Sequence, residues 1–378
     1  MRELFDLPKN PVDVSVLLLQ ASKEDAVRTA SHRWVITCLG GVALAAVFSL
    51  GQEKAVEVKP VLPQVKCLDQ DAKDQDDMCI WVHPTDPAQS TLIASDKKAN
   101  KLFDYDLAGN TLQSLPAQHP GNIDVRYGFP LGGQKVDIVA LNQRDDPRIL
   151  VYQVDGKSRQ LQRVDNDSIR TGENYGGTLY RSPKTGRFFF LTTSETGVIE
   201  QYELADDGTG KVAGKKVRSW RIGKSEAAVA DDEAGKVYIG EESKGVWEVG
   251  GEPDDPTPGK LVIKLGENGL TGDVEGLAIY PLPGGAGYLI VSNQGRNNFK
   301  VYQRAGAHEF VGTFAVQGAN KTDGLDVCNA SLGPHFPKGL FASHTAEGGC
   351  PVLLTPWDAI ARGASSSLHV DTSWDRRK

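Results

Sequence analysis

The sequence predicts an all-β protein, a six-bladed β-propeller, and three observations support that fold class. The chain of 378 residues contains 41 glycines and 20 prolines, which is typical of a turn-rich β protein. Short apolar runs recur about every 50 residues, centred on Leu92, Ile138, Phe189, Tyr238, Leu289 and Leu340. A following run in each unit carries an aromatic residue, namely Tyr105, Tyr152, Tyr202, Trp247 and Tyr302, with Trp357 near the end of the last unit. Two β-sandwich domains, the alternative, would not repeat at a constant period.

Residues 1–33 form a polar leader before an uncharged apolar segment. That segment, WVITCLGGVALAAVFSL at 34–50, is short for a bilayer span but sufficient for a signal peptide, and small residues precede a cleavage point before Gln52. We therefore expect 34–51 to be a signal peptide and the protein to be exported, either to the periplasm or as a secreted protein. An uncleaved inner-membrane anchor is the alternative.

Residues 52–75 approach the propeller, which is expected to span 76–378. The last unit, from Asp323 to Trp357, offers only three clear strands. Val61–Lys66 can supply the fourth, which would close the ring with both chain ends in one blade and remove an exposed sheet edge.

The segment 225–247 predicts an antiparallel hairpin. It contains two alternating apolar runs separated by a turn near Gly235. Because the start of one strand lies beside the end of its partner, Glu226 is expected at the same end as Glu241 and Glu242. This end of the hairpin would form a rim of carboxylate oxygens.

Acids recur at the same place in the other units. The innermost strands of a propeller run in one direction along the central channel, so the residues that lead into them meet at one opening. Those residues are Asp76 and Asp77, Asp124, Tyr175, Glu226, Asp273 and Glu275, and Asp323 and Asp326. The second strands end at this face with Lys97, Lys98, Arg144 and Glu242, and Arg126 follows Asp124. A carboxylate cluster beside basic residues is therefore predicted at one channel opening.

Crowded carboxylates raise one another's pKa unless a cation joins them. Several Ca²⁺ ions are the expected partners, because calcium accepts irregular sets of carboxylate oxygens. Calcium beside Lys and Arg suits a multiply phosphorylated ligand, and a calcium-bound water could attack phosphorus directly. The motifs R-H-G-x-R-x-P and C-x₅-R of covalent phosphatases do not occur in the chain.

Charge and cysteine content narrow the function classes. The net charge of −7 argues against a nucleic-acid partner and disfavours a polyanionic substrate unless bound cations reverse the local sign. Of the five cysteines, four lie in the part expected to be exported, which is compatible with two disulfides. We expect Cys328–Cys350 to be one of them.

The ordered motifs of residues 65–378 resemble the blade motifs of one family. They are DDMCIWVHP (76–84), SDKK (95–98), NIDVRYGF (122–129), YGGTLY (175–180), EAAVADDE (226–233), YIGEE (238–242), DVEG (273–276), SNQG (292–295) and TDGLDV (322–327). They are similar to those of the β-propeller phytases. The resemblance implies a calcium-dependent phosphatase of the 3-phytase type, expected to act as a monomer on calcium-complexed myo-inositol hexakisphosphate (phytate). It also implies a cleavage subsite and an adjacent affinity subsite.

The same resemblance assigns roles residue by residue. It implies calcium ligands at the cleavage site in Asp76, Glu226, Glu242, Asp273 and Glu275, and neighbouring or structural calcium ligands in Asp77, Asp124 and Asp323. Tyr180 matches the tyrosine of the site, so the catalytic set is expected to be Glu226, Glu242, Asp273, Glu275 and Tyr180. Substrate phosphates would be bound by Lys97, Lys98, Arg126, Arg144, Tyr180 and Arg181.

The chain departs from the family pattern at a few positions. Glu195 stands where a phosphate-binding lysine is expected, and Arg181 stands where a histidine is common. Some residues also have a plainer interpretation. Tyr180 could pack between blades, His83 and His344 could be hydrogen-bonded strand ends, and Asp231, Asp232 and Glu233 are expected to form a solvated turn.

Two other functions remain open at this point. A calcium-dependent lactone hydrolase would share the fold but would not need the gathered basic residues. A non-catalytic propeller would bind a partner through this face and use calcium as a structural ion.

Overall fold

The computed structural model describes residues 58–256 and 258–377. The leader and the apolar segment 34–51 therefore lie outside the described residues. Within the described ranges, no helix is long and apolar enough to cross a membrane.

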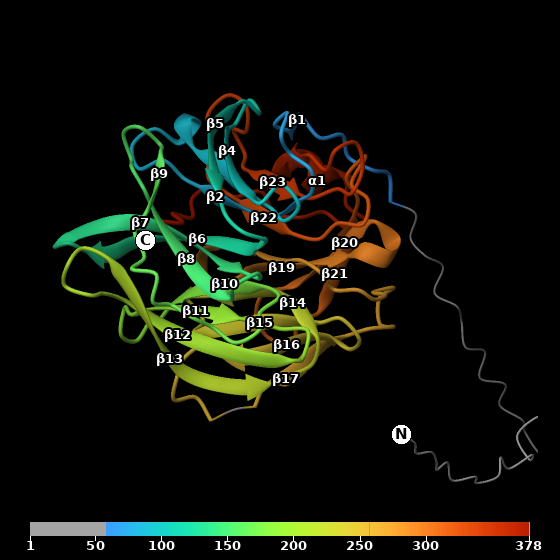
Figure 1. The fold of residues 1–378 in the computed structure, drawn as a ribbon. Coiled ribbons are helices and arrows are strands. Elements are labelled where there is room, and N and C mark those ends of the chain that lie inside the picture. The colour runs from blue at the N-terminus through green and yellow to red at the C-terminus, as the bar shows by residue number, and fades with distance from the viewer. Residues whose placement is uncertain (1–57, 257, 378) are drawn as a thin grey trace, which may run out of the picture. The chain divides into compact units, whose positions relative to one another are not determined.

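The described chain forms six antiparallel sheets of four strands each, arranged as a six-bladed β-propeller (Figure 1). The first blade contains β2 (Gln75–Trp81), β3 (Thr91–Asp96), β4 (Lys101–Asp106) and β5 (Thr111–Pro116). The second contains β6 (Pro120–Leu131), β7 (Gln134–Gln143), β8 (Arg148–Val154) and β9 (Leu161–Arg163). The third contains β10 (Gly177–Arg181), β11 (Phe188–Thr192), β12 (Val198–Asp206) and β13 (Val212–Arg221).

The fourth blade contains β14 (Ser225–Asp231), β15 (Lys236–Glu241), β16 (Gly245–Gly250) and β17 (Lys260–Lys264). The fifth contains β18 (Leu277–Pro281), β19 (Gly287–Asn293), β20 (Asn298–Gln303) and β21 (Phe310–Phe314). The sixth contains β22 (Leu325–Cys328), β23 (Leu340–Ser343), β24 (Val352–Pro356) and β1 (Val65–Cys67). One α-helix, α1 (Trp357–Gly363), and the 3₁₀ turns Pro87–Gln89, Pro283–Gly285 and Gln294–Arg296 complete the described elements.

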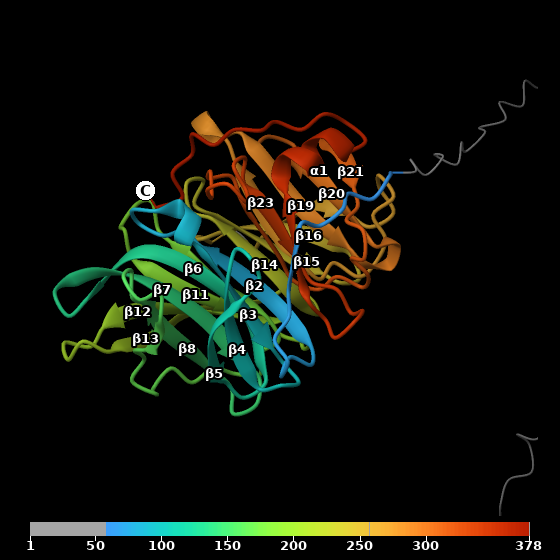
Figure 2. The same cartoon turned by 90° about the horizontal axis from the view of Figure 1, so that it is seen from above.

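The ring closes in the predicted way, with an N-terminal strand in the last blade. β1 pairs with β24 in antiparallel register, with Val65 opposite Leu354 and Cys67 opposite Val352. Seen from above, β1 lies beside the C-terminal blade (Figure 2). The strand is later and shorter than the expected Val61–Lys66, because Val61 instead forms an isolated bridge to Val316, beyond β21 of the fifth blade.

The predicted second strands are confirmed as β3, β7, β11, β15, β19 and β23. The aromatic residues of the third strands, such as Tyr105 and Tyr302, are buried in the core between blades, except Trp247, which is half-buried and donates its indole N–H to Glu241. Trp357 differs, because it begins α1 instead of lying in a strand, and its ring stacks on Tyr280 at 4.2 Å. The helix thereby covers apolar surface between the fifth and sixth blades.

The innermost strands of three blades begin with an irregular register. The pairing shifts between Gln75 and Met78 in β2, between Pro120 and Ile123 in β6, and between Ser225 and Ala228 in β14. Such bulges leave residues outside the ladder and re-aim their side chains. In this way Asp76, Asp77, Asn122 and Glu226 are freed from the regular alternation at the channel.

The expected disulfide Cys328–Cys350 is wrong for this structure. Cys67, Cys79, Cys328 and Cys350 are all free. Cys328 ends β22, opposite Leu340, whereas Cys350 lies in the loop between β23 and β24. Because β23 runs between those two points, the two thiols lie at opposite ends of the sixth blade.

Candidate functional site

Five carboxylates from four blades meet at one opening of the channel, and we refer to Asp76, Glu226, Glu242, Glu275 and Asp323 as the acid cluster. The hairpin β14–β15 brings Glu226 to the end where β15 stops, with Ser225 opposite Glu241, as its sequence predicted. Asp76 comes from the bulge of β2, while Glu275 and Asp323 lie just before β18 and β22. The predicted convergence of these acids is thus seen in the structure.

Two basic side chains bridge the acid cluster. Lys97 Nζ lies 2.6 Å from Asp76 Oδ1 and 3.2 Å from Asp323 Oδ2. An Arg144 nitrogen lies 2.9 Å from Asp76 Oδ2 and forms a short ion pair with Glu226. Lys97 and Arg144 directly follow β3 and β7, the second strands of the first and second blades, as expected.

The acid cluster holds more negative charge than these two cations neutralise. Burial raises the pKa of Glu226 to about 7, and the charge of Asp76 adds to the effect. Burial and the charges of Glu226, Glu242 and Asp323 raise the pKa of Glu275 to about 10. Asp76 is different, because Arg144 and Lys97 outweigh its burial and hold its pKa below the usual value.

The acid cluster fits a hard divalent cation. Glu242 Oε1 and Glu275 Oε2 are buried and have no hydrogen-bond partner among the described residues. An unpaired buried carboxylate oxygen is costly, and calcium accepts several such oxygens in irregular geometry. Asp273, which was expected as a further ligand, is exposed two residues before Glu275.

The structure adds Tyr175 and Lys224 to the site. The Tyr175 ring lies 4.6 Å from the Arg144 guanidinium carbon and 5.3 Å from Lys224 Nζ. Burial and the charge of Glu226 raise the pKa of Tyr175, so its hydroxyl stays protonated. The sequence placed Tyr175 among the residues leading into the innermost strands but gave it no role, and it did not single out Lys224.

Tyr180 and Arg181 do not lie at the acid cluster. The Tyr180 ring is fully buried between blades, stacks on Phe189 at 5.9 Å, and its hydroxyl donates to Glu252 at 2.9 Å. The plainer interpretation of Tyr180 as packing is therefore the one the structure supports. Arg181 places its guanidinium over the Phe188 ring at 5.7 Å and donates its backbone N–H to Asp232.

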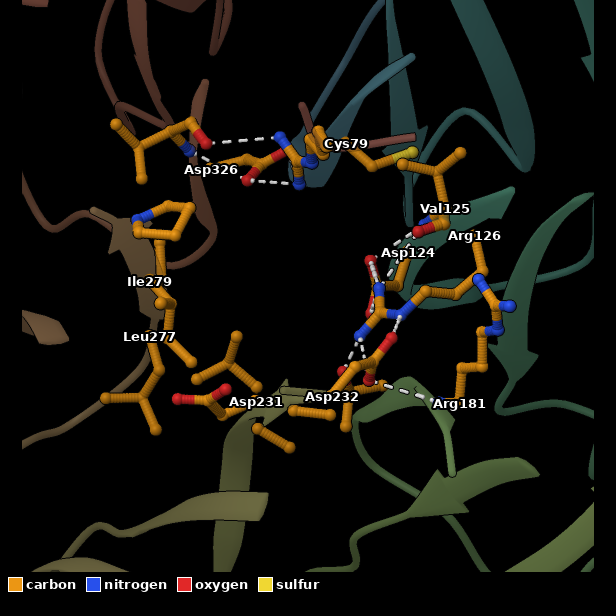
Figure 3. Close-up of a pocket in the computed structure, with 18 of the residues that line it drawn as sticks. Cys79, Asp124, Val125, Arg126, Arg181, Asp231, Asp232, Leu277, Ile279 and Asp326 are labelled. Carbon is orange, nitrogen blue, oxygen red and sulfur yellow. Dashed lines mark hydrogen bonds and ion pairs between the residues drawn. The ribbon is translucent and has the colours of Figure 1, made fainter. Parts of the chain in front are cut away.

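Asp77, Asp124, Arg126 and Asp326 line the channel below the acid cluster, contrary to the expectation that they lie at the opening. The channel holds a cavity of about 500 Å³, and Figure 3 shows Asp124, Arg126 and Asp232 on one of its walls. Arg126 pairs with Asp124 at 2.9 Å and with Asp232 at 2.7 Å, while Asp77 Oδ2 accepts from the backbone N–H of Ile123. Arg126 lies several residues beyond the bulge at the start of β6. It is therefore farther along the strand and away from the opening.

Lys98 is exposed and pairs with Asp74 at 2.8 Å, outside the acid cluster. His344 is a buried strand end whose Nδ1 accepts from the backbone N–H of Asp323, as its plainer interpretation predicted. The expected solvated turn is wrong for Asp231, which is 3% exposed and pairs with Arg304, and for Asp232, which pairs with Arg126 in the channel.

Comparison with known proteins identifies the family of the chain. A model of the phytase family matches residues 26–378. The 3-phytase of Bacillus subtilis (strain 168) is 41% identical over 316 residues, which cover 78% of this chain and 82% of that protein. The chain therefore belongs to the phytase family and is a phytase with the β-propeller fold.

Proposed function

We propose that the protein is a calcium-dependent phosphomonoester hydrolase that removes phosphates from calcium-complexed phytate. The observation that supports this most is the acid cluster itself. It combines buried, unpaired carboxylate oxygens with the basic residues Lys97, Arg144 and Lys224 at one opening. A site that must bind both a divalent cation and a polyanion needs both charges side by side.

Within this proposal the acids hold calcium. Asp76, Glu226, Glu242, Asp273, Glu275 and Asp323 would supply the oxygen ligands. Bound calcium would supply charge neutralisation at the phosphoryl group and would activate a water for direct attack on phosphorus. No residue of the acid cluster needs to form a covalent bond to phosphate.

The basic residues and Tyr175 orient the substrate. Arg144 is held by two carboxylates and by the Tyr175 ring, so its guanidinium is fixed at the opening. A fixed guanidinium can bind two phosphate oxygens at once. Lys97 adds a point charge, and the Tyr175 hydroxyl, which is protonated and hydrogen-bonded to Glu226, holds the ring against Arg144.

The first prediction tests calcium dependence. The protein should release inorganic phosphate from phytate with calcium and lose this activity with a chelator. Glu226→Gln and Asp273→Asn should each lower turnover at least 100-fold, because each removes a charged ligand, while the melting temperature at saturating calcium changes little. Calorimetric titration should show weaker or fewer calcium sites in both variants.

A matched control is Glu267→Gln, since Glu267 is 59% exposed and paired only loosely with Lys264. Its activity and calcium binding should equal those of the wild type. Wild-type turnover in Glu226→Gln would show that the acid cluster is not the metal site. Phosphate release unaffected by the chelator would reject calcium dependence.

A further inference from the structure

Lys224 lies at the rim of the acid cluster, in the short connection between β13 and β14. Its Nζ is 3.0 Å from Glu242 Oε2 and 5.3 Å from the centre of the Tyr175 ring. The backbone of this residue is fixed, because its carbonyl oxygen accepts from the backbone N–H of Glu242 at 3.1 Å. The backbone N–H of Ile222 likewise donates to Gly197. The flexible part of Lys224 is therefore its side chain alone.

The three cations at the opening are held to different degrees. The side chains of Lys97 and Arg144 are 23% and 13% exposed, and each pairs with two members of the acid cluster. Lys224 is 47% exposed and pairs with one carboxylate. Such exposed ion pairs contribute only about 0–1 kcal/mol, so this ammonium can leave its partner at little cost.

Lys224 and a divalent cation would compete for the carboxylate of Glu242. Its Oε2 is bound to the ammonium, and its Oε1 is buried without a partner. A divalent ion held by several carboxylates competes with a single tethered ammonium for this group. The displaced ammonium still has the face of Tyr175 beside it, and cations are attracted to aromatic faces.

We propose that Lys224 is a substrate-binding residue whose ammonium moves from Glu242 to a phosphate group of the substrate when a divalent cation occupies the acid cluster. This inference rests on the proposed function. It distinguishes Lys224 from Lys97 and Arg144, which cannot leave without depriving two carboxylates of the acid cluster of an ion-pair partner. Lys224 then couples metal binding to substrate binding. Its ammonium competes with the metal for Glu242 and, once displaced, binds a phosphate group of the substrate.

The test is Lys224→Gln, measured for phytate hydrolysis at fixed free calcium and for calcium binding by calorimetry without substrate. We expect the KM for phytate to rise about 5- to 10-fold with kcat within about 2-fold, consistent with loss of one charge-assisted contact. We also expect calcium to bind more tightly, because its intramolecular competitor is gone. Lys224→Arg should keep a KM near that of the wild type.

Lys244 offers a matched control. It is 55% exposed, pairs with Glu241 at 3.0 Å, and lies 5.9 Å from the Trp247 ring, outside the acid cluster. Lys244→Gln should change neither KM nor calcium affinity.

The outcomes separate the two proposals. An unchanged KM in Lys224→Gln, or a loss of affinity for both phytate and calcium, would overturn the inference while leaving the proposed function in place. Absence of phosphate release by the wild-type protein with calcium would reject the proposed function, and this inference with it.

Discussion

Asp104 is a buried carboxylate on β4 that belongs to no ion pair among the described residues. It is 1% exposed, and neither its oxygens nor Thr91 Oγ1 has a well-formed hydrogen bond. Burial raises the pKa of Asp104 to about 7, and the nearby Thr91 hydroxyl and Arg159 charge offset only part of this effect. The folded state therefore holds a proton that the unfolded chain releases at lower pH.

Because the folded pKa is the higher one, the stability contributed by protonated Asp104 is complete near pH 4 and is lost as the pH rises through about 7. Asp104→Asn should therefore stabilise the protein at pH 8, by at most about 4 kcal/mol, and give little gain at pH 4. Denaturant unfolding of both proteins at the two pH values measures this difference.

The exposed Glu309→Gln is the control and should show no such pH-dependent gain. If Asp104→Asn were equally stable relative to the wild type at both pH values, the buried carboxylate would be ionised in the fold.

Residue by residue, the sequence predicted the acid cluster but not all of its neighbours. The acids could be found because each stands where an innermost strand begins or a second strand ends. Tyr175 and Tyr180 stand at the two ends of one short motif. Because β10 begins at Gly177, Tyr175 precedes the strand and lies at the acid cluster, whereas Tyr180 lies within the strand. Arg126 was misplaced for a related reason, since the bulge of β6 shifts the register by an amount that no local pattern specifies.

At the level of elements, close packing between neighbouring innermost strands positions the site. A Cβ added to Gly176 would overlap the carbonyl oxygen of Glu226 and lie 2.7 Å from Asn122 Oδ1. The third blade therefore approaches the second and fourth only because residue 176 has no side chain. This contact places the third blade directly against the backbone of Glu226 in β14.

Gly176→Ala should accordingly destabilise the fold by about 1–3 kcal/mol through overpacking, as measured by denaturant unfolding. Gly156→Ala is the matched control, because its added Cβ would meet Pro84 Cγ at an ordinary 3.4 Å. The control should be neutral or slightly stabilising. Equal stability of the two variants would mean that the blades can separate at Gly176 without cost.

The blade pattern was predictable because each unit repeats its apolar runs. The two chain segments that close the ring, β1 and the region around Trp357, were harder to predict. β1 has only three residues, and its register is decided by pairing with β24, which is almost 290 residues later in the chain. Trp357 continues the aromatic pattern in sequence but begins a helix, because the sixth blade takes its outer strand from β1. Both features depend on ring closure and not on local propensity.

Across the whole molecule, the C-terminal segment joins several blades at the channel end away from the acid cluster. The backbone of Asp371 exchanges hydrogen bonds with the Tyr280 hydroxyl of the fifth blade. Arg376 pairs with Asp326 of the sixth blade at 3.0 Å, and Arg377 pairs with Asp137 of the second blade at 2.7 Å. Asp326 also accepts from the backbone N–H of Ile80, so the same carboxylate links the sixth blade to the first.

This arrangement predicts that Arg376 stabilises the closed ring. Burial raises the pKa of Asp326, and Arg376 only partly reverses that effect, so removing the guanidinium leaves a poorly compensated charge in the channel. Arg376→Met should cost about 2–4 kcal/mol of unfolding free energy, and adding Asp326→Asn should recover part of it. Arg362→Met, which breaks an exposed pair with Asp358, should cost less than about 0.5 kcal/mol. Because the acid cluster lies at the other opening, the Arg376→Met variant should bind calcium with wild-type affinity below its unfolding temperature. A loss of both stability and calcium affinity would mean that the two ends of the channel are coupled.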